Sequence, residues 1–264
     1  MFLTRVLTAT VLLAAFLAAL FLLDRSAFAA VVAGVIALAA HEWGDLAGLG
    51  RGVRIAYAAA CLVLFGLLLG SVLLEPVLWA AALFWILAVP WWLIVGVTAK
   101  DKAWLPAAGI AVLVPAGLAM ATLPPRQVLM VLGLIWISDT AAYLAGRAWG
   151  RRKLAVSISP GKTWEGVAGG AIGCVIYAII WALSDPDLHT RVQGIVWVLF
   201  LAGTLLLCAL GVVGDLFESA LKRQAGAKDS GKLLPGHGGV LDRIDSATAA
   251  LPVALLLVQA MGST

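Results

Sequence analysis

The sequence predicts an all-α protein, a polytopic transmembrane helical bundle with about nine spans and a cytoplasmic N-terminus. Three observations lead to this fold class. Of the 264 residues, 63% are hydrophobic and only 12% are charged; the apolar residues form runs long enough to cross a bilayer; and Lys and Arg gather in alternate connections. A soluble domain is about half apolar and about a quarter charged. The composition therefore excludes a water-soluble fold.

Apolar runs define the spans in order along the chain. The hydrocarbon core is about 30 Å thick, and about 20 helical residues cross it. Runs near that length are separated by charged residues, glycine or proline, and they lie at 6–23, 27–43, 54–73, 77–97, 103–122, 127–149, 165–183, 192–214 and 246–261. Cys61, Cys174 and Cys208 each stand alone inside a run, which indicates small core residues and neither a zinc site nor a disulfide framework.

The placement of basic residues orients these spans. With the N-terminus inside, only Arg25, Arg126 and Arg191 of the 18 Lys and Arg residues fall on the outer side. This bias follows the positive-inside rule and would be lost if one internal span were miscounted. We therefore expect a multi-pass protein of the inner (cytoplasmic) membrane, with its active site facing the cytoplasm.

The polar residues divide the chain into two regions. We interpret 1–122 as a scaffold of transmembrane helices, and we leave open a homodimer contact through it. An N-terminal Arg followed by an apolar run resembles a cleavable signal peptide, but the run is long and another hydrophobic helix follows, so we expect the first helix to be retained. We interpret 123–264 as the catalytic region, with cytoplasmic loops at 150–165 and 215–245.

Several acidic residues lie in or beside apolar runs. Asp139 is near the middle of its run, where a carboxylate is costly unless it faces a partner or water, so it is a candidate for the functional site. The alternative is an Asp that only bonds a neighbouring helix. Tyr143 follows one turn later on the same face. We expect Glu42 and Asp45 to mark the end of the second span; the alternative is that they line a cavity.

The connection after the sixth span is basic. Its charges fit either a positive-inside signal or contact with a polyphosphate. The segment Gly161-Lys162-Thr163 is similar to the end of a P-loop, but Val156 stands where a glycine is required and no strand is expected before it, which excludes a Walker A site. We expect Ser159 to Glu165 to cap the next helix and to present Lys162 beside its N-terminus, where phosphate binds favourably.

The longest polar run follows the eighth span. Its first part should continue that helix, with one face formed by Asp215, Glu218, Ser219 and Lys222. Glu218 and Lys222 alone would be an ordinary i,i+4 pair. Further on, glycines around a histidine allow close approach of a ligand to the backbone. Carboxylates interleaved with Lys and Arg indicate metal-assisted phosphoryl or nucleotidyl transfer, because Mg²⁺ usually binds through one or two carboxylates plus substrate phosphates.

Two blocks of residues carry a resemblance to a known family. The first reads Ser219-x-x-Lys222-Arg223, then Lys228-Asp229, then Pro235-x-His237-Gly238-Gly239-x-x-Asp242-Arg243-x-Asp245. The second reads Asp139-x-x-Ala142-Tyr143, Gly146, Gly150 and Ser159-Pro160-x-Lys162-Thr163-x-Glu165-Gly166. Together they resemble the signature of the phosphatidate cytidylyltransferases (CDP-diacylglycerol synthases). Gly161 departs from the pattern, since many members carry a basic residue there, and the N-terminal half matches only in hydropathy and span count.

The resemblance implies transfer of CMP from CTP to phosphatidic acid, which gives CDP-diacylglycerol and pyrophosphate in phospholipid biosynthesis. It implies Mg²⁺ as cofactor, with metal ligands among Asp215, Asp242 and Asp245. The catalytic candidates are Asp215, Asp242, Asp245, Lys222, Arg243 and His237; the last is open as an acid, a phosphate donor or a loop former. The candidates for holding substrate are Ser159, Lys162, Ser219, Arg223, Lys228, Asp229, Lys232, Gly238, Gly239, Asp139 and Tyr143.

The expected partners are CTP, phosphatidic acid and the bilayer, and no nucleic acid. A CTP-dependent polyprenol or phytol kinase, which transfers the γ-phosphoryl group, is an alternative function. An ion-coupled transporter would use Asp139 in a relay, but the two halves show no repeat symmetry of that kind. A structural scaffold would leave the costly polar groups without a purpose. We expect the lipid to enter a cavity between the last four spans.

Overall fold

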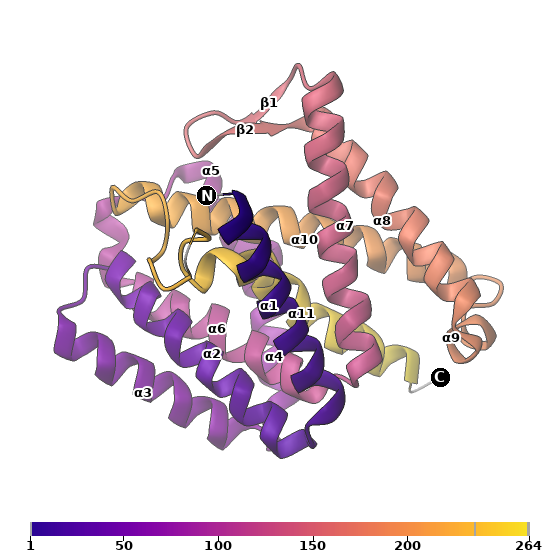
Figure 1. The fold of residues 1–264 in the computed structure, drawn as a ribbon, viewed down its shortest axis with the longest axis horizontal. Coiled ribbons are helices and arrows are strands. Elements are labelled where there is room, and N and C mark those ends of the chain that lie inside the picture. Colours follow the sequence, from indigo (N-terminus) through magenta and orange to yellow (C-terminus); the bar gives the residue numbers. More distant parts are fainter. Residues whose placement is uncertain (1, 235, 263–264) are drawn as a thin grey trace.

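The computed structural model describes residues 2–234 and 236–262, and it is a bundle of helices (Figure 1). Within this part of the chain, eight helical segments are long and apolar enough to cross a membrane, and α1 adds a shorter apolar stretch. The single helices are α1 (Phe2–Leu22), α2 (Arg25–Leu46), α3 (Arg51–Leu68), α6 (Leu105–Thr122), α7 (Pro125–Trp149), α8 (Trp164–Ser184), α10 (Val196–Gln224) and α11 (Leu241–Gly262). The predicted polytopic bundle is confirmed.

The segment between α3 and α6 is a composite helix. It consists of α4 (Leu74–Leu83), a π-helical turn η1 (Phe84–Ala88) and α5 (Val89–Val95). Pro90 lies just after the π-turn, where its missing N–H interrupts the ordinary hydrogen-bond pattern. A 3₁₀ turn, η2 (Ala99–Ala103), and the short α9 (Pro186–Arg191) lie in connections.

The connection between α7 and α8 contains a β-hairpin. Strand β1 (Lys153–Ala155) pairs antiparallel with β2 (Ser159–Thr163). The expectation that no strand precedes Gly161-Lys162-Thr163 is therefore wrong, although Val156 still excludes a Walker A site. The Thr163 hydroxyl accepts a hydrogen bond from Gly166 N and caps α8, as the sequence indicated. Strands of three and five residues carry no periodic pattern that could reveal them.

Small residues let α7 and α8 pack closely. A Cβ on Gly169 would overlap Ala145, and a Cβ on Gly170 would lie 3.0 Å from the Ser138 carbonyl oxygen. Backbones approach in this way when glycines line a helix seam. The seam fixes α8 against the C-terminal half of α7, and the hairpin connects these two helices.

An aromatic cluster ties α10 to the N-terminal half. The Phe217 ring lies 5.5 Å from the ring of Trp92, 5.8 Å from Trp85 and 6.1 Å from Trp43. Trp43 in turn donates a hydrogen bond from Nε1 to the Leu105 carbonyl at 2.7 Å. The apolar face of α10 is thus fixed against α2, η1 and α5, which leaves the opposite, polar face of α10 for the site.

The hairpin, the loop after α10 and the N-terminus lie toward one end of the molecule, while α9 and the C-terminal end of α11 lie toward the other (Figure 1). Two hydrogen bonds confirm this grouping. Arg223 Nε donates to the Ile158 carbonyl in the hairpin, and Gln224 Nε2 donates to the Leu46 carbonyl at the end of α2. The loops that the charge bias assigned to one side of the membrane therefore meet.

Candidate active site

A buried ion-pair triad centred on Lys222 joins α10 to α11. Its Nζ lies 2.7 Å from Glu218 Oε2, one turn earlier, and 2.7 Å from Asp242 Oδ1 in the first turn of α11. The exposed fractions of the three side chains are 12%, 3% and 6% for Lys222, Glu218 and Asp242. The predicted i,i+4 pair is present, but it is half of a larger contact. Removal of one member would leave a buried charge without its partner.

The second oxygen of Asp242 organises the glycine-rich loop. Oδ2 accepts hydrogen bonds from Ser230 N at 2.9 Å and from Gly239 N at 2.8 Å. Gly238 has a φ of +83°, and a Cβ there would lie 2.6 Å from the same oxygen. Glycine is therefore required at Gly238 both for its backbone conformation and for space. Asp242 sits where both helix and loop converge, as the sequence predicted for the mouth of the last helix.

Glu42 from α2 completes this arrangement. Its side chain is 7% exposed, and it accepts hydrogen bonds from Val240 N at 3.0 Å, Leu241 N at 2.9 Å and Ser230 Oγ at 3.0 Å. The expectation that Glu42 merely marks a helix end is wrong: its carboxylate holds the N-terminus of α11, where backbone N–H groups lack partners within the helix. Asp45 fits the expectation, since its exposed carboxylate only pairs with Arg54.

Ser230 links the two carboxylates. Its hydroxyl oxygen lies 3.0 Å from Glu42 Oε2 and 3.0 Å from Asp242 Oδ2, so one proton is shared between them. A Cβ on Gly239 would overlap both Ser230 Oγ and the Glu42 carboxylate. The sequence analysis missed Glu42 and Ser230. An acid at a helix end that lacks an i,i+4 partner on its own helix was the only signal for Glu42.

Lys162 brings the hairpin to the polar face of α10. Its Nζ lies 2.5 Å from Asp215 Oδ2, and Ser219 Oγ donates to Asp215 Oδ1 at 3.3 Å. Both ion-pair partners are partly exposed, at 25% and 29% of their side-chain surface. Lys162 was predicted beside the N-terminus of α8, and it lies there, one residue before the Thr163 cap. Ser159 lies at the other end of β2 and is partly buried.

Asp139 and Asp245 extend the acidic face. Asp139 on α7 interacts electrostatically with both Asp215 and Lys162. Asp245, one turn into α11, interacts with Asp215, Lys222 and Asp139, and its Oδ1 accepts a hydrogen bond from Ser246 N. We name the group formed by these acids the carboxylate cluster: Asp139, Asp215, Glu218, Asp242 and Asp245.

Other predicted residues stand around this centre rather than in it. Arg223 donates to the carbonyls of Ile158 and Ala227, which fixes the start of the loop. Tyr143 accepts a hydrogen bond from Arg147 on the outside of α7. His237 is partly buried in the loop, where its backbone N donates to the Leu234 carbonyl. The loop and helix residues with exposed side chains are Lys228, Asp229, Lys232 and Arg243. Pro235 of the motif lies outside the described residues.

The donor set fits a divalent cation that arrives with phosphate. Among the described residues, no three His, Cys, Asp or Glu side chains converge as a complete metal cage. The carboxylate cluster nevertheless faces only two lysines, Lys162 and Lys222, so negative charge is in excess. Glu218 Oε1 is buried and has no hydrogen-bond partner. Excess carboxylate oxygen with few protein ligands is the pattern of a hard cation that completes its shell with water and phosphate.

The fold and the site together define a multi-pass membrane transferase that acts on phosphate groups. Its carboxylates and lysines alternate at a loop-covered helix end, as charge stabilisation during phosphoryl or nucleotidyl transfer requires. Residues 3–261 match the cytidylyltransferase family, and the chain belongs to that family.

Curated relatives agree with this family. The chain is 39% identical to the phosphatidate cytidylyltransferase of Pseudomonas aeruginosa, across 98% of this chain and 97% of the relative. It is 36% identical to the phosphatidate cytidylyltransferase of Haemophilus influenzae, across 94% of this chain and 95% of the relative. The phosphatidate cytidylyltransferase of Thermotoga maritima is 44% identical across 49% of this chain and 47% of its own length.

The Glu42 contacts predict a change in stability and in loop order. Glu42→Gln keeps the side-chain volume but puts an NH₂ where one carboxylate oxygen accepts, so that it faces either Val240 N or both Leu241 N and Ser230 Oγ. We therefore expect the free energy of unfolding to fall by about 2–4 kcal/mol. The loop at 226–240 should also become more sensitive to trypsin, which cuts at Lys228 and Lys232. Thermal unfolding in detergent and the rate of limited proteolysis measure the two effects.

Asp45→Asn is the matched control, three residues further along the same helix end. It removes an exposed ion pair and should leave both measurements unchanged. Equal unfolding temperatures and cleavage rates for Glu42→Gln and wild type would contradict the role of Glu42.

Proposed function

We propose that this chain transfers CMP from CTP to phosphatidic acid, giving CDP-diacylglycerol and pyrophosphate. The observation that carries the proposal is the buried Lys222 triad beside the carboxylate cluster, in a chain of the cytidylyltransferase family. A nucleoside triphosphate and a lipid phosphate are both anionic. At one helix end the site offers lysines, which attract such anions, and carboxylates, which can bind a cation. The relatives named phosphatidate cytidylyltransferase support the same lipid substrate.

The reaction needs positioning and charge stabilisation more than proton transfer. An oxygen of the lipid phosphate attacks the α-phosphorus of CTP; the new P–O bond forms as the bond from that phosphorus to the bridging β-phosphate oxygen breaks, and pyrophosphate leaves with the electron pair. Because the nucleophile is already an anion, no strong general base is required. A bound divalent cation supplies charge neutralisation at the phosphates.

We assign the basic residues of the hairpin, α10 and the following loop to the phosphates of the two substrates. Lys162 on the hairpin can exchange its Asp215 contact for a phosphate oxygen, since both partners are partly exposed. Lys222 is held in place by two carboxylates and therefore presents a fixed positive charge. We assign the remaining cations to the triphosphate and the lipid headgroup: Arg223, Lys228, Lys232 and Arg243. Ser159, Ser219, Asp229 and the backbone of Gly238 and Gly239 shape the same surface.

We assign Mg²⁺ as the cation, with Asp215 and Asp245 as its ligands. From the sequence, Asp215 and Asp242 were the preferred ligands and Asp245 a weaker candidate. The Asp242 side chain is only 6% exposed, against 29% for Asp215, and its oxygens accept hydrogen bonds from Lys222 and from the backbone N–H groups of Ser230 and Gly239. A metal there would have to displace these donors. Asp242 instead fixes the loop and Lys222, while Asp139 adds negative charge from the α7 side.

We place the site on the cytoplasmic face of the inner membrane, where CTP is available. The positive-inside bias supports this orientation, and it puts the N-terminus inside. Residues 1–122 then form a scaffold that also contributes Glu42 to the site, and a homodimer contact through this region remains a prediction. The alternative, a polyprenol or phytol kinase, has no observation in its favour.

The transfer of CMP is tested with purified protein in detergent, phosphatidic acid, Mg²⁺ and CTP, labelled at the α-phosphate in one reaction and at the γ-phosphate in a parallel one. Wild type should place the α-phosphate label in lipid, whereas label transferred only from the γ-phosphate would support the kinase instead. Asp242→Asn should lower the rate about 100-fold or more, because it unpairs Lys222 and releases the loop. Asp187→Asn in α9 is the control, and its rate should equal that of wild type.

The metal assignment predicts a difference between acidic residues. Asp215→Asn and Asp245→Asn should each raise the Mg²⁺ concentration for half-maximal rate by about ten-fold or more, because each removes an anionic oxygen ligand. Asp242→Asn should lower the maximal rate with little shift in that concentration. Mg²⁺ titrations of all three variants measure this. A shift for Asp242→Asn alone would reverse the assignment.

The orientation is tested by cysteine labelling in cells. The native cysteines Cys61, Cys174 and Cys208 are buried, so background is low. Ser157→Cys lies on the hairpin and Thr190→Cys on α9, both at exposed positions. A membrane-impermeant maleimide should label Thr190→Cys in spheroplasts and Ser157→Cys only after lysis. The reverse pattern would invert the topology.

A further inference from the structure

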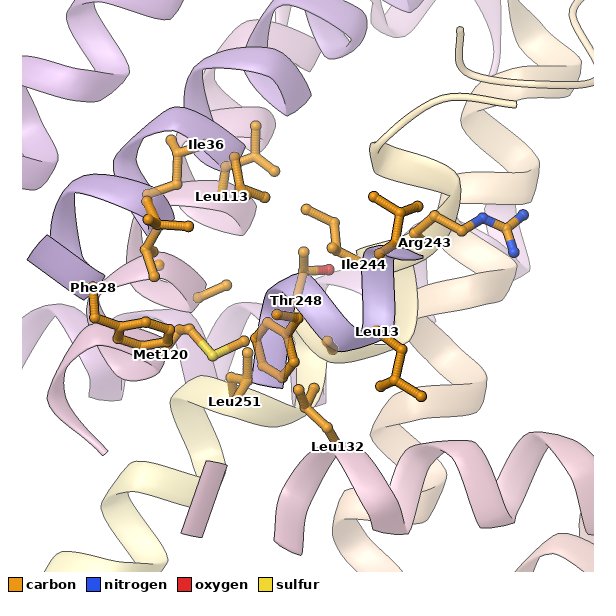
Figure 2. A pocket seen from close by; sticks show the side chains of 18 of the residues that line it. Leu13, Phe28, Ile36, Leu113, Met120, Leu132, Arg243, Ile244, Thr248 and Leu251 are labelled. Atoms are coloured by element: carbon orange, nitrogen blue, oxygen red, sulfur yellow. The ribbon is translucent and has the colours of Figure 1, made fainter. Parts of the chain in front are cut away.

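An apolar chamber of about 550 Å³ lies against one face of α11 (Figure 2). Its walls come from α1, α2, α6, α7 and α11, including Phe28, Leu113, Met120 and Leu132. The chamber thus draws most of its wall from the N-terminal half, whereas the sequence led us to expect a cavity between the last four spans. Its volume is in the range of sites for small organic ligands.

Helix α11 separates the chamber from the carboxylate cluster. Ile244, Ala247, Thr248 and Leu251 follow the spacing of one helix face and line the chamber. The opposite face packs against α10: a Cβ on Gly214 would lie 2.6 Å from the Asp245 carbonyl oxygen. One helix therefore carries the acids on one side and an apolar wall on the other, so the two spaces lie about one helix diameter apart, roughly 10 Å.

Two nitrogen-bearing side chains belong to the lining of the chamber. Arg243 and His237 are part of its lining, in an otherwise almost wholly apolar wall. Figure 2 shows the Arg243 side chain leaving the chamber, with its guanidinium directed away from the apolar interior. The side chain is exposed and immediately follows Asp242. This arrangement complements an anionic headgroup joined to an apolar chain, with the headgroup beside Arg243 and the chain inside.

The first helix contributes one wall of the chamber. Ala9, Leu12, Leu13 and Phe16 of α1 line it, again with the spacing of one helix face. Leu12 and Leu13 are 40% and 43% exposed, and Val11, on the opposite face of α1, is 57% exposed. One face of α1 is therefore turned toward the chamber and the other away from the bundle.

We propose that the chamber holds one acyl chain of the phosphatidic acid substrate and that its α1 wall sets the acyl-chain preference; this inference rests on the proposed function. A chain that leaves the bilayer gains nothing from the hydrophobic effect, because lipid tails are as apolar as the wall. The chamber must therefore select among acyl chains by its shape. A side chain that narrows the chamber should reject long chains and still admit short ones.

Ala9→Phe narrows the chamber from α1, and Leu13→Ala widens it. With dioctanoyl and dioleoyl phosphatidic acid in mixed micelles, we expect Ala9→Phe to lower kcat/KM for the long-chain lipid about ten-fold relative to the short-chain lipid. Leu13→Ala should shift the ratio the other way. Val11→Phe, on the exposed face of the same helix, is the control and should keep the wild-type ratio. Equal losses with both lipids in Ala9→Phe, or the same shift in Val11→Phe, would overturn the proposal.

A second measurement separates this inference from the proposed function. Phosphatidic acid with a diazirine at the end of one acyl chain is photolysed with the full-length protein, and the labelled peptides are identified by mass spectrometry. Wild type should be labelled at chamber residues of α1 and α6, such as Leu13 and Met120, and Ala9→Phe should lose that label. This result does not depend on CMP transfer. Labelling confined to lipid-facing positions such as Val11 would refute the chamber, whereas chamber labelling without CMP transfer would refute only the proposed reaction.

Discussion

The rest of the structure depends on how the Asp242 carboxylate is neutralised. One of its oxygens binds the Lys222 ammonium and the other binds backbone N–H groups of the loop, so a single side chain joins α10, the glycine-rich loop and α11. A buried charge requires a partner and hydrogen bonds to all its oxygens, and this one has both. This contact also fixes the positions of Asp215 and Asp245. Asp215 lies within one turn of Glu218 on α10, and Asp245 lies within one turn of Asp242 on α11.

The N-terminal helices take part in the site through two contacts of different kinds. Phe217 packs among tryptophans of the first half and sets the rotation of α10, so that Asp215 and Lys222 face the hairpin and α11. Glu42 adds a second carboxylate to Asp242 at the N-terminus of α11, and it accepts hydrogen bonds from the N–H groups of Val240 and Leu241. A division into an inert scaffold and a catalytic half therefore understates the first half.

The sequence was sufficient for features that depend on local pattern. Runs of apolar residues located the spans, and the 3.6-residue period placed Asp215, Ser219 and Lys222 on one face of α10. The paired motifs also identified the two elements that meet at Lys162 and Asp215. The features that could not be predicted were long-range contacts or lacked a periodic pattern. Glu42 and Leu241, for example, are separated by nearly the whole chain, and no local sequence pattern indicates that they are in contact. The β-hairpin was missed because its strands are too short to alternate.

The opposed faces of α11 explain why a charged site can lie so close to lipid. Carboxylates at the edge of a bilayer are tolerated only when they face partners or water, and those of α11 face Lys222, the loop and α10. Ile244, which lies between them along the chain, and Ala247, two residues after Asp245, face the apolar chamber instead. A water-soluble triphosphate and a membrane lipid can then approach the same helix from its two sides without either leaving its own solvent. The only group that must pass from one side to the other is the lipid phosphate, and Arg243 lies between the two sides. Its apolar stem can contact the lipid while its charged guanidinium stays in a polar environment.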